Sequence, residues 1–294
     1  MTLLQQQLIA SFIFGGGLVA LQAYAAEKVP KRISGIVLAL PSTIVVNFYF
    51  LGLILEPSEF HKILPIIPAP LAFSLIFITA YIYIAKLLYN LFFCKASSWW
   101  ELLKQTFIKP KLSNGKKILL ITISSILATS IWLLLSLPLA IGEFSNLSLS
   151  LIIFVVIALV NQMLINRGCN KHSITKAIHY KPIQQIARAC FAGLMVATTV
   201  YLGATLGPFW AGVTASFPAA FLASITIIHY YYDHEALSGF FKSTPLGISS
   251  LVVYAIVADY SFAAWGPGLG TAVSILVSLL YSLLLSRLNK FENK

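Results

Sequence analysis

Long apolar stretches follow one another along almost the whole chain, and short polar segments separate them. Stretches of about 17 to 25 apolar residues can cross a bilayer as helices. They lack the alternation of apolar and polar positions that marks a barrel strand, and an open sheet edge is not tolerated in hydrocarbon. The pattern predicts an all-α polytopic membrane protein with nine spans, near residues 8–26, 33–55, 71–93, 118–141, 147–165, 187–205, 209–232, 246–264 and 269–285.

Basic residues give the predicted spans a direction. If the N-terminus is outside, the cytoplasmic segments contain 19 of the 20 Lys and Arg residues, and Lys62 alone lies on the other side. This asymmetry is the pattern described by the positive-inside rule. We therefore expect the N-terminus outside and the C-terminus in the cytoplasm.

Composition agrees with a membrane protein and argues against a soluble one. Hydrophobic residues make up 59% of the chain, charged residues 10%, and the mean hydropathy is +0.87. Soluble domains carry about 25% charged residues. The basic residues behind the net charge of +11 lie almost entirely in the predicted cytoplasmic segments, so the charge is mainly a signal of topology. The expected partner is therefore the lipid bilayer, and no nucleic acid is expected. The three cysteines fall at or near the cytoplasmic side, where a reducing compartment argues against disulfides, and their spacing fits no metal motif.

The chain resembles itself at an offset of 177 residues, which aligns 10–83 with 187–260 without gaps. Apolar segments share Leu, Ile and Ala by composition alone, and this is the alternative to a true duplication. Matches at Gly and Pro weigh more, because these residues have specific backbone roles. The aligned identities include Gly16/Gly193, Val19/Val196, Ala20/Ala197, Tyr24/Tyr201, Gly35/Gly212, Pro41/Pro218 and Pro68/Pro245.

The two copies start at spans 1 and 6, and this odd offset of five spans inserts the second copy upside down. Inverted-topology repeats recur in secondary transporters, whose substrate sites lie near the bilayer midplane at the repeat interface. The predicted organisation is a first repeat over 1–141, a connector with span 5 and a basic loop over 142–186, and a second repeat over 187–294. Within the first repeat, 95–112 is predicted to be a short interfacial helix with two tryptophans.

The second repeat contains the sequence Trp210-Ala211-Gly212-Val213 and then Phe217-Pro218, followed by His229-Tyr230 and an acidic turn. This arrangement resembles the small GlpM-like family of bacterial inner-membrane proteins. The resemblance covers about 90 residues of the second repeat. It implies a four-helix membrane unit, here in duplicate, located in the bacterial inner membrane, and it implies no reaction or substrate.

Two prolines occupy equivalent central positions in spans 2 and 7. A central proline removes a backbone hydrogen bond and kinks the helix, and the freed carbonyls need a neighbour, water or a ligand. Each proline has hydroxyl side chains beside it. A structural kink is the alternative to a binding site here. The predicted solute-binding residues are Pro41, Thr43, Asn47, Thr214, Ser216 and Pro218.

Asp259 is an ionisable residue within predicted span 8. Such residues are functional candidates by default, because burying a charge in hydrocarbon is costly. We expect Asp259 to bind a proton or a cation that is coupled to transport. The alternative is a carboxylate at the membrane interface, in contact with water and without a function.

The densest polar cluster comprises His229, Asp233, His234 and Glu235. His229 and Asp233 are four residues apart and share a helix face, so a metal site is conceivable. A polar helix end is the simpler interpretation, and neither a metal nor a cofactor is predicted. The sequence contains no nucleophile elbow and no paired-carboxylate motif within a span, so no catalytic residue is predicted.

The sequence therefore favours a transporter or permease for a small solute. One alternative is a membrane-embedded enzyme that acts on a lipid-linked substrate through His229, Asp233 and Asp259. Another is an accessory subunit of an envelope assembly. Association of several copies is left open.

Overall fold

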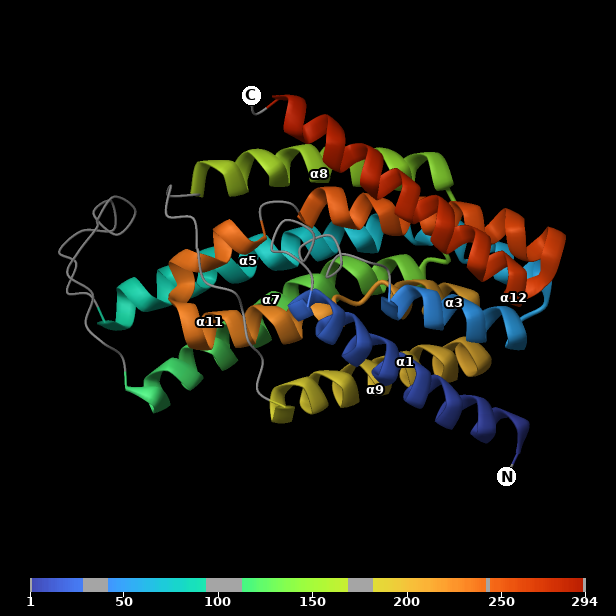
Figure 1. The fold of residues 1–294 in the computed structure, drawn as a ribbon, viewed down its shortest axis with the longest axis horizontal. Helices are drawn as coiled ribbons and strands as arrows, with labels where there is room; N and C mark the ends of the chain where they lie inside the picture. The colour runs from blue at the N-terminus through green and yellow to red at the C-terminus, as the bar shows by residue number, and fades with distance from the viewer. Residues whose placement is uncertain (1, 29–41, 94–112, 169–181, 242–243, 293–294) are drawn as a thin grey trace.

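A computed structural model of the chain describes residues 2–28, 42–93, 113–168, 182–241 and 244–292. These residues form helices and contain no strand, which confirms the predicted all-α class (Figure 1). The predicted interfacial helix at 95–112 lies outside the described residues. The longer helices are α1 (Leu3–Lys28), α3 (Ser42–Ile54), α5 (Pro68–Phe93), α7 (Asn114–Ile141), α8 (Leu147–Gly168), α9 (Pro182–Leu206), α11 (Ala219–Phe240) and α12 (Thr244–Glu292).

Seven helical stretches are long and apolar enough to cross a membrane, as judged by their length and composition. One of them, Pro208–Tyr231, joins the short helix α10 (Pro208–Ala215) to α11. Helix α3 is shorter, and residues 33–41 of its predicted span lie outside the described residues. The chain is thus a multi-pass membrane protein, and the count of nine spans stays a prediction.

Helix α12 contains a reversal of the chain at Gly266. Gly266 has φ 73° and ψ 172°, a backbone conformation that favours glycine. The side-chain oxygens of Ser261 and Ser274 lie 3.0 Å apart. In a straight helix, 13 residues rise roughly 20 Å. The two parts of α12 therefore fold back on each other, and the turn falls between predicted spans 8 and 9.

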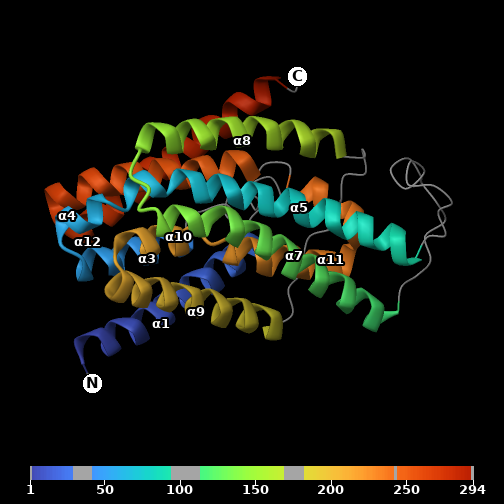
Figure 2. The same cartoon turned by 180° about the vertical axis from the view of Figure 1, so that it is seen from behind.

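Helix α5 lies at the centre of the bundle and packs against α7, α8, α11 and α12 (Figures 1 and 2). Its side chains Leu75, Phe77, Ile78 and Tyr81 are fully buried. This helix is apolar on all its faces. Its central position explains this pattern, because apolar neighbours surround it.

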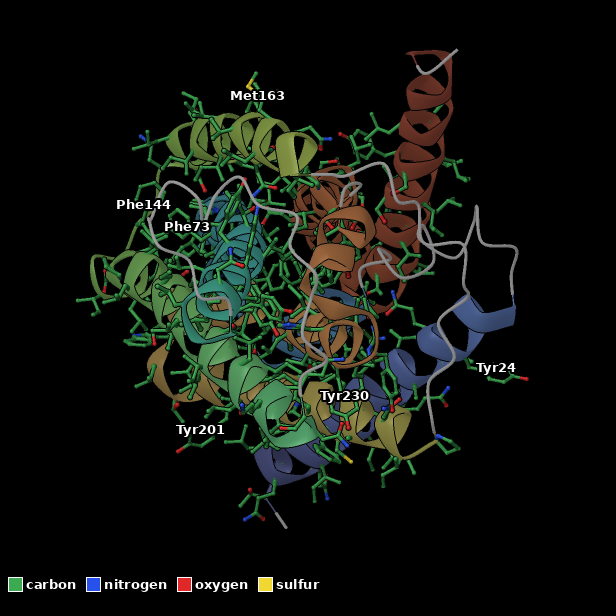
Figure 3. The ribbon with its side chains drawn as sticks, turned by 90° about the vertical axis from the view of Figure 1, so that its left-hand side faces the viewer. Tyr24, Phe73, Phe144, Met163, Tyr201 and Tyr230 are labelled. Carbon is green, nitrogen blue, oxygen red and sulfur yellow. The ribbon has the colours of Figure 1, made fainter. Side chains whose placement is uncertain are left out.

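Large apolar side chains cover the outside of the bundle. Figure 3 shows Tyr24 on α1, Met163 on α8 and Tyr201 on α9 pointing away from it, and each is about half exposed or more. In water this surface would favour aggregation, whereas lipid tails solvate it at no cost. The exposed apolar surface therefore supports contact with a bilayer.

Helices α1 and α9 form the most extensive helix pair in the bundle, and they cross antiparallel. A Cβ at Gly16 would lie 2.7 Å from the carbonyl oxygen of Ala189. A Cβ at Gly193 would lie 2.5 Å from the carbonyl oxygen of Phe12. The two backbones meet because neither position carries a side chain, as in other small-residue interfaces of membrane helices.

This crossing yields a prediction about stability. Gly16→Ala and Gly193→Ala should each destabilise the protein by about 1–3 kcal/mol, because the new methyl group forces two backbones apart. Gly17→Ala is the matched control, since a Cβ at Gly17 meets no atom within 4 Å. The measurement is the thermal unfolding midpoint of the purified protein. Equal midpoints for Gly16→Ala and Gly17→Ala would contradict the close crossing.

Candidate functional site

The predicted span 7 is interrupted between α10 and α11, at residues 216–218. Ser216 has φ −87° and ψ 0°, Pro218 has φ −77° and ψ 47°, and α11 begins at Ala219. Proline has no backbone N–H and cannot continue the hydrogen-bond ladder of α10. This interruption confirms the break predicted at Pro218. Its predicted counterpart, Pro41, lies outside the described residues.

Side chains from α5 and α7 satisfy and cover this break. The hydroxyl of Ser74 is 3.1 Å from the carbonyl oxygens of both Ser216 and Pro70, and its single proton is shared between these two acceptors. The indole N–H of Trp132 donates to the Ser74 oxygen at 3.2 Å, and its ring packs edge-on against Phe217 at 5.1 Å between centroids. The freed backbone carbonyl is therefore held by a buried network rather than left without a partner.

The hydroxyls of Thr214 and Ser216 are engaged within α10 itself. Thr214 donates to the carbonyl oxygen of Trp210 at 2.7 Å, and Ser216 donates to that of Gly212 at 3.0 Å. Such bonds to the preceding turn are common for hydroxyls in membrane helices. Each hydroxyl oxygen keeps its capacity as an acceptor. Contact of these two residues with a solute stays a prediction.

Asn47 is a buried polar residue of α3, 2% exposed, and its side-chain oxygen Oδ1 has no hydrogen-bond partner among the residues that the structure describes. A buried acceptor without a partner costs about 1–3 kcal/mol. Thr43, one turn earlier on α3, is half-buried. Asn47 is therefore the described residue of the predicted set that most needs a further partner.

Helix register brings Asn47 to the level of the break. A Cβ at Gly203 would touch both Leu51 of α3 and Ala211 of α10, so these two residues lie at one level. Figure 2 shows that α3 ends and α10 begins at the same end of the bundle, so the two helices run antiparallel. One turn deeper, α3 presents Asn47 and α10 presents Ala215.

Asp259 lies elsewhere, towards the end of the bundle that carries the short helix α4 (Pro57–His61). Its carboxylate oxygen Oδ2 is 2.7 Å from Nδ1 of His61. The Asp259 side chain is 3% exposed, whereas that of His61 is 69% exposed. The Asp259 side chain is thus shielded from direct contact with water, while its place relative to the membrane interface and a function in ion coupling both stay predictions.

His229 is buried, and its Nδ1 lies 2.9 Å from the hydroxyl oxygen of Tyr81 on α5. The side chains of Asp233, His234 and Glu235 lie outside the described residues. Across the described ranges, no group of three or more His, Cys, Asp and Glu side chains could hold a metal ion. In the described structure, His229 is thus hydrogen-bonded to a tyrosine.

Sequence reasoning missed His61, Ser74 and Trp132. His61 belongs to the same polar turn as Glu56 and Glu59, and this turn gave a signal for topology but none for a partner of Asp259. Ser74 and Trp132 look like ordinary residues of apolar spans. Their roles depend on the packing of three helices that are distant in sequence.

Comparison of the chain with known protein families, with curated proteins and with solved structures finds no match. The function is therefore argued from the residues of the chain itself.

The network at the break yields a second prediction. Ser74→Ala should lower the free energy of unfolding by about 1–3 kcal/mol, because the buried carbonyl of Ser216 loses its side-chain donor. The indole N–H of Trp132 keeps the carbonyl oxygen of Pro70, at 3.2 Å, as a partner. Ser249→Ala is the matched control, since this half-buried hydroxyl donates to Leu246 of its own helix. Denaturation of both purified variants measures the difference, and a Ser74→Ala effect no larger than the control would refute the network.

Proposed function

We propose that this protein is an integral membrane transporter or permease for a small solute. In this proposal nine spans form two inverted repeats, and the solute binds between α3 and the break that separates α10 from α11. The bacterial inner membrane, with the N-terminus outside, is the proposed location. Membership of the GlpM-like family belongs to the same proposal.

The observation that carries the proposal is the reciprocity of the α1–α9 crossing. Gly16 approaches Ala189, and Gly193 approaches Phe12. The offset that aligns Gly16 with Gly193 also aligns Phe12 with Ala189. The alignment therefore converts the first contact into the second, which is what a two-fold relation between the two helices would produce. Because the helices are antiparallel, this relation supports repeats of opposite orientation, which is the architecture of many secondary transporters.

The break supports a polar solute site near the middle of the bundle. Discontinuous helices form the substrate sites of inverted-repeat transporters, because their ends expose backbone groups. Pro218 provides no side-chain cap for the first N–H groups of α11, and Asn47 provides an acceptor without a partner. A solute that carries both a hydrogen-bond donor and an acceptor would complement these groups.

No specific observation favours the two alternatives. A lipid-directed enzyme would need a reactive group near its polar residues, and the described structure engages His229 with Tyr81 and Asp259 with His61. An accessory subunit would need a docking surface distinct from the lipid-facing one. The transporter is therefore the function that the described residues support best.

A solute screen tests the proposal. Thermal unfolding of the purified protein with a panel of small polar solutes should reveal one that raises stability, by about 2.7 kcal/mol at a concentration 100 times its Kd. Asn47→Ala should abolish this stabilisation because it removes the acceptor, and Pro218→Ala should abolish it because a continuous helix no longer exposes its N–H groups. Both variants should also lose flux of that solute in proteoliposomes.

Pro138→Ala is the control for the proline variant. Pro138 is an exposed proline near the end of α7 and outside the proposed site. It should keep both the stabilisation and the flux. Full retention of both in Asn47→Ala and Pro218→Ala would refute the site.

Labelling of single cysteines tests the orientation. In a chain without its three natural cysteines, a cysteine at Asn146 should react with an impermeant reagent added to intact cells. A cysteine at Asn114, which is at the other end of α7, should react after permeabilisation alone. Both positions are exposed, so a difference reports on sidedness rather than on burial. The reverse pattern would overturn the proposed orientation.

A further inference from the structure

The pair formed by Asp259 and His61 joins a buried acid to an exposed base. Asp259 lies on the first part of α12, its side chain is 3% exposed, and its Oδ2 is 2.7 Å from Nδ1 of His61. His61 ends α4, and its side chain is 69% exposed. One member of the pair is thus shielded from water while the other is in direct contact with it.

Aromatic rings pack next to the pair of Asp259 and His61. Phe60, which precedes His61, stacks on Phe262 of α12 at 4.9 Å between centroids and packs edge-on against Phe48 of α3 at 5.5 Å. Phe60 is 4% exposed. The rings therefore pack beside the pair, and the imidazole of His61 is the described polar contact between the buried Asp259 side chain and an exposed group.

Other titratable groups do not replace His61 in this role. Among the described residues, η1 (Leu64–Ile66) and α8 up to residue 165 carry no charged side chain. Glu59 forms its own ion pair with Lys62 at 2.6 Å. The remaining titratable residues with described side chains, in the elements that pack against α12 and in α12 itself, are Tyr49, Glu56, Tyr81, Tyr83, Lys86, Tyr89, Tyr254, Tyr260 and Tyr281. No described hydrogen bond or ion pair joins any of them to Asp259.

The proton balance of the pair gives it two stable forms. With the carboxylate ionised and both ring nitrogens of His61 protonated, the pair has no net charge and its two members attract each other. One more proton from water leaves a neutral carboxylic acid facing the interior and an imidazolium facing the solvent. The ion pair that holds α4 against α12 is then lost, while no charge is left buried.

We propose that Asp259 and His61 form a proton-binding site that exchanges with the aqueous phase at the α4 end of the bundle, and that the proton is the coupling ion. The coupling rests on the transport function proposed above, whereas the binding of the proton does not. Histidine suits this role because its charge changes between about pH 5 and pH 8. Loading the site weakens the contact between α4 and α12, and α4 directly follows α3, which carries Asn47.

Infrared difference spectroscopy of the full chain in lipid tests the site. Acidification from about pH 8 to about pH 5 should produce the carbonyl band of a protonated, buried carboxylic acid. Asp259→Asn should lose this band. In His61→Gln the band should persist to a higher pH than in the wild type, because the cation that favours the ionised carboxylate is gone. Glu59→Gln is the matched control and should leave the band unchanged, since Glu59 pairs with Lys62.

The outcomes separate the two proposals. A band that survives in Asp259→Asn, or whose pH dependence is the same in His61→Gln and wild type, overturns the proton site. His61 is exposed, so its variant should fold even if Asp259→Asn does not. If the band behaves as expected but the flux of the screened solute is the same with and without an imposed proton gradient, the coupling is overturned. If no solute is transported while the band behaves as expected, the transport proposal fails and the proton site stands.

Discussion

The close approach of α1 and α9 at Gly16 and Gly193 is the contact on which the rest of the arrangement depends. It fixes α9, and α9 in turn sets the position of α10, which follows it after the single residue Gly207. Further along α9, the absence of a side chain at Gly203 lets α3 and α10 pack against it at one level. The position of the break relative to Asn47 is thus a consequence of glycines that lie outside the break.

Interruptions of helices inside a bilayer need compensation, because no water is available to bind the freed backbone groups. The chain compensates its two described interruptions in different ways. At Ser216 a hydroxyl from another helix, Ser74, binds the carbonyl. Around the reversal at Gly266, the hydroxyls of Ser261 and Ser274 both donate to the carbonyl oxygen of Gly270 and so tie the two arms of the hairpin together. The first solution couples the break to the central helix, whereas the second is local.

Hydropathy and the special residues Pro and Gly predicted much of the fold: the helical class, the break at Pro218 and the chain reversal after span 8. They could not predict contacts, because periodicity assigns a residue to a face and leaves its neighbour undefined. His61 and Asp259 are separated by 198 positions, and Ser74 and Ser216 by 142. Likewise, hydropathy treats α10 and α11 as one span, since the residues between them are nearly as apolar as those in the helices.

Helix α8 connects the two halves of the chain and also braces one of them. Its Ser150 accepts the backbone N–H of Ala69 in the first turn of α5, and its Asn161 donates to the carbonyl oxygen of Leu75. Helix α12, which aligns with α5, receives far less packing from α8. Two halves that are alike in sequence therefore differ in mechanical support. For the proposed transporter, in which two inverted repeats would exchange conformations, a brace on one repeat alone would make the two end states unequal in energy.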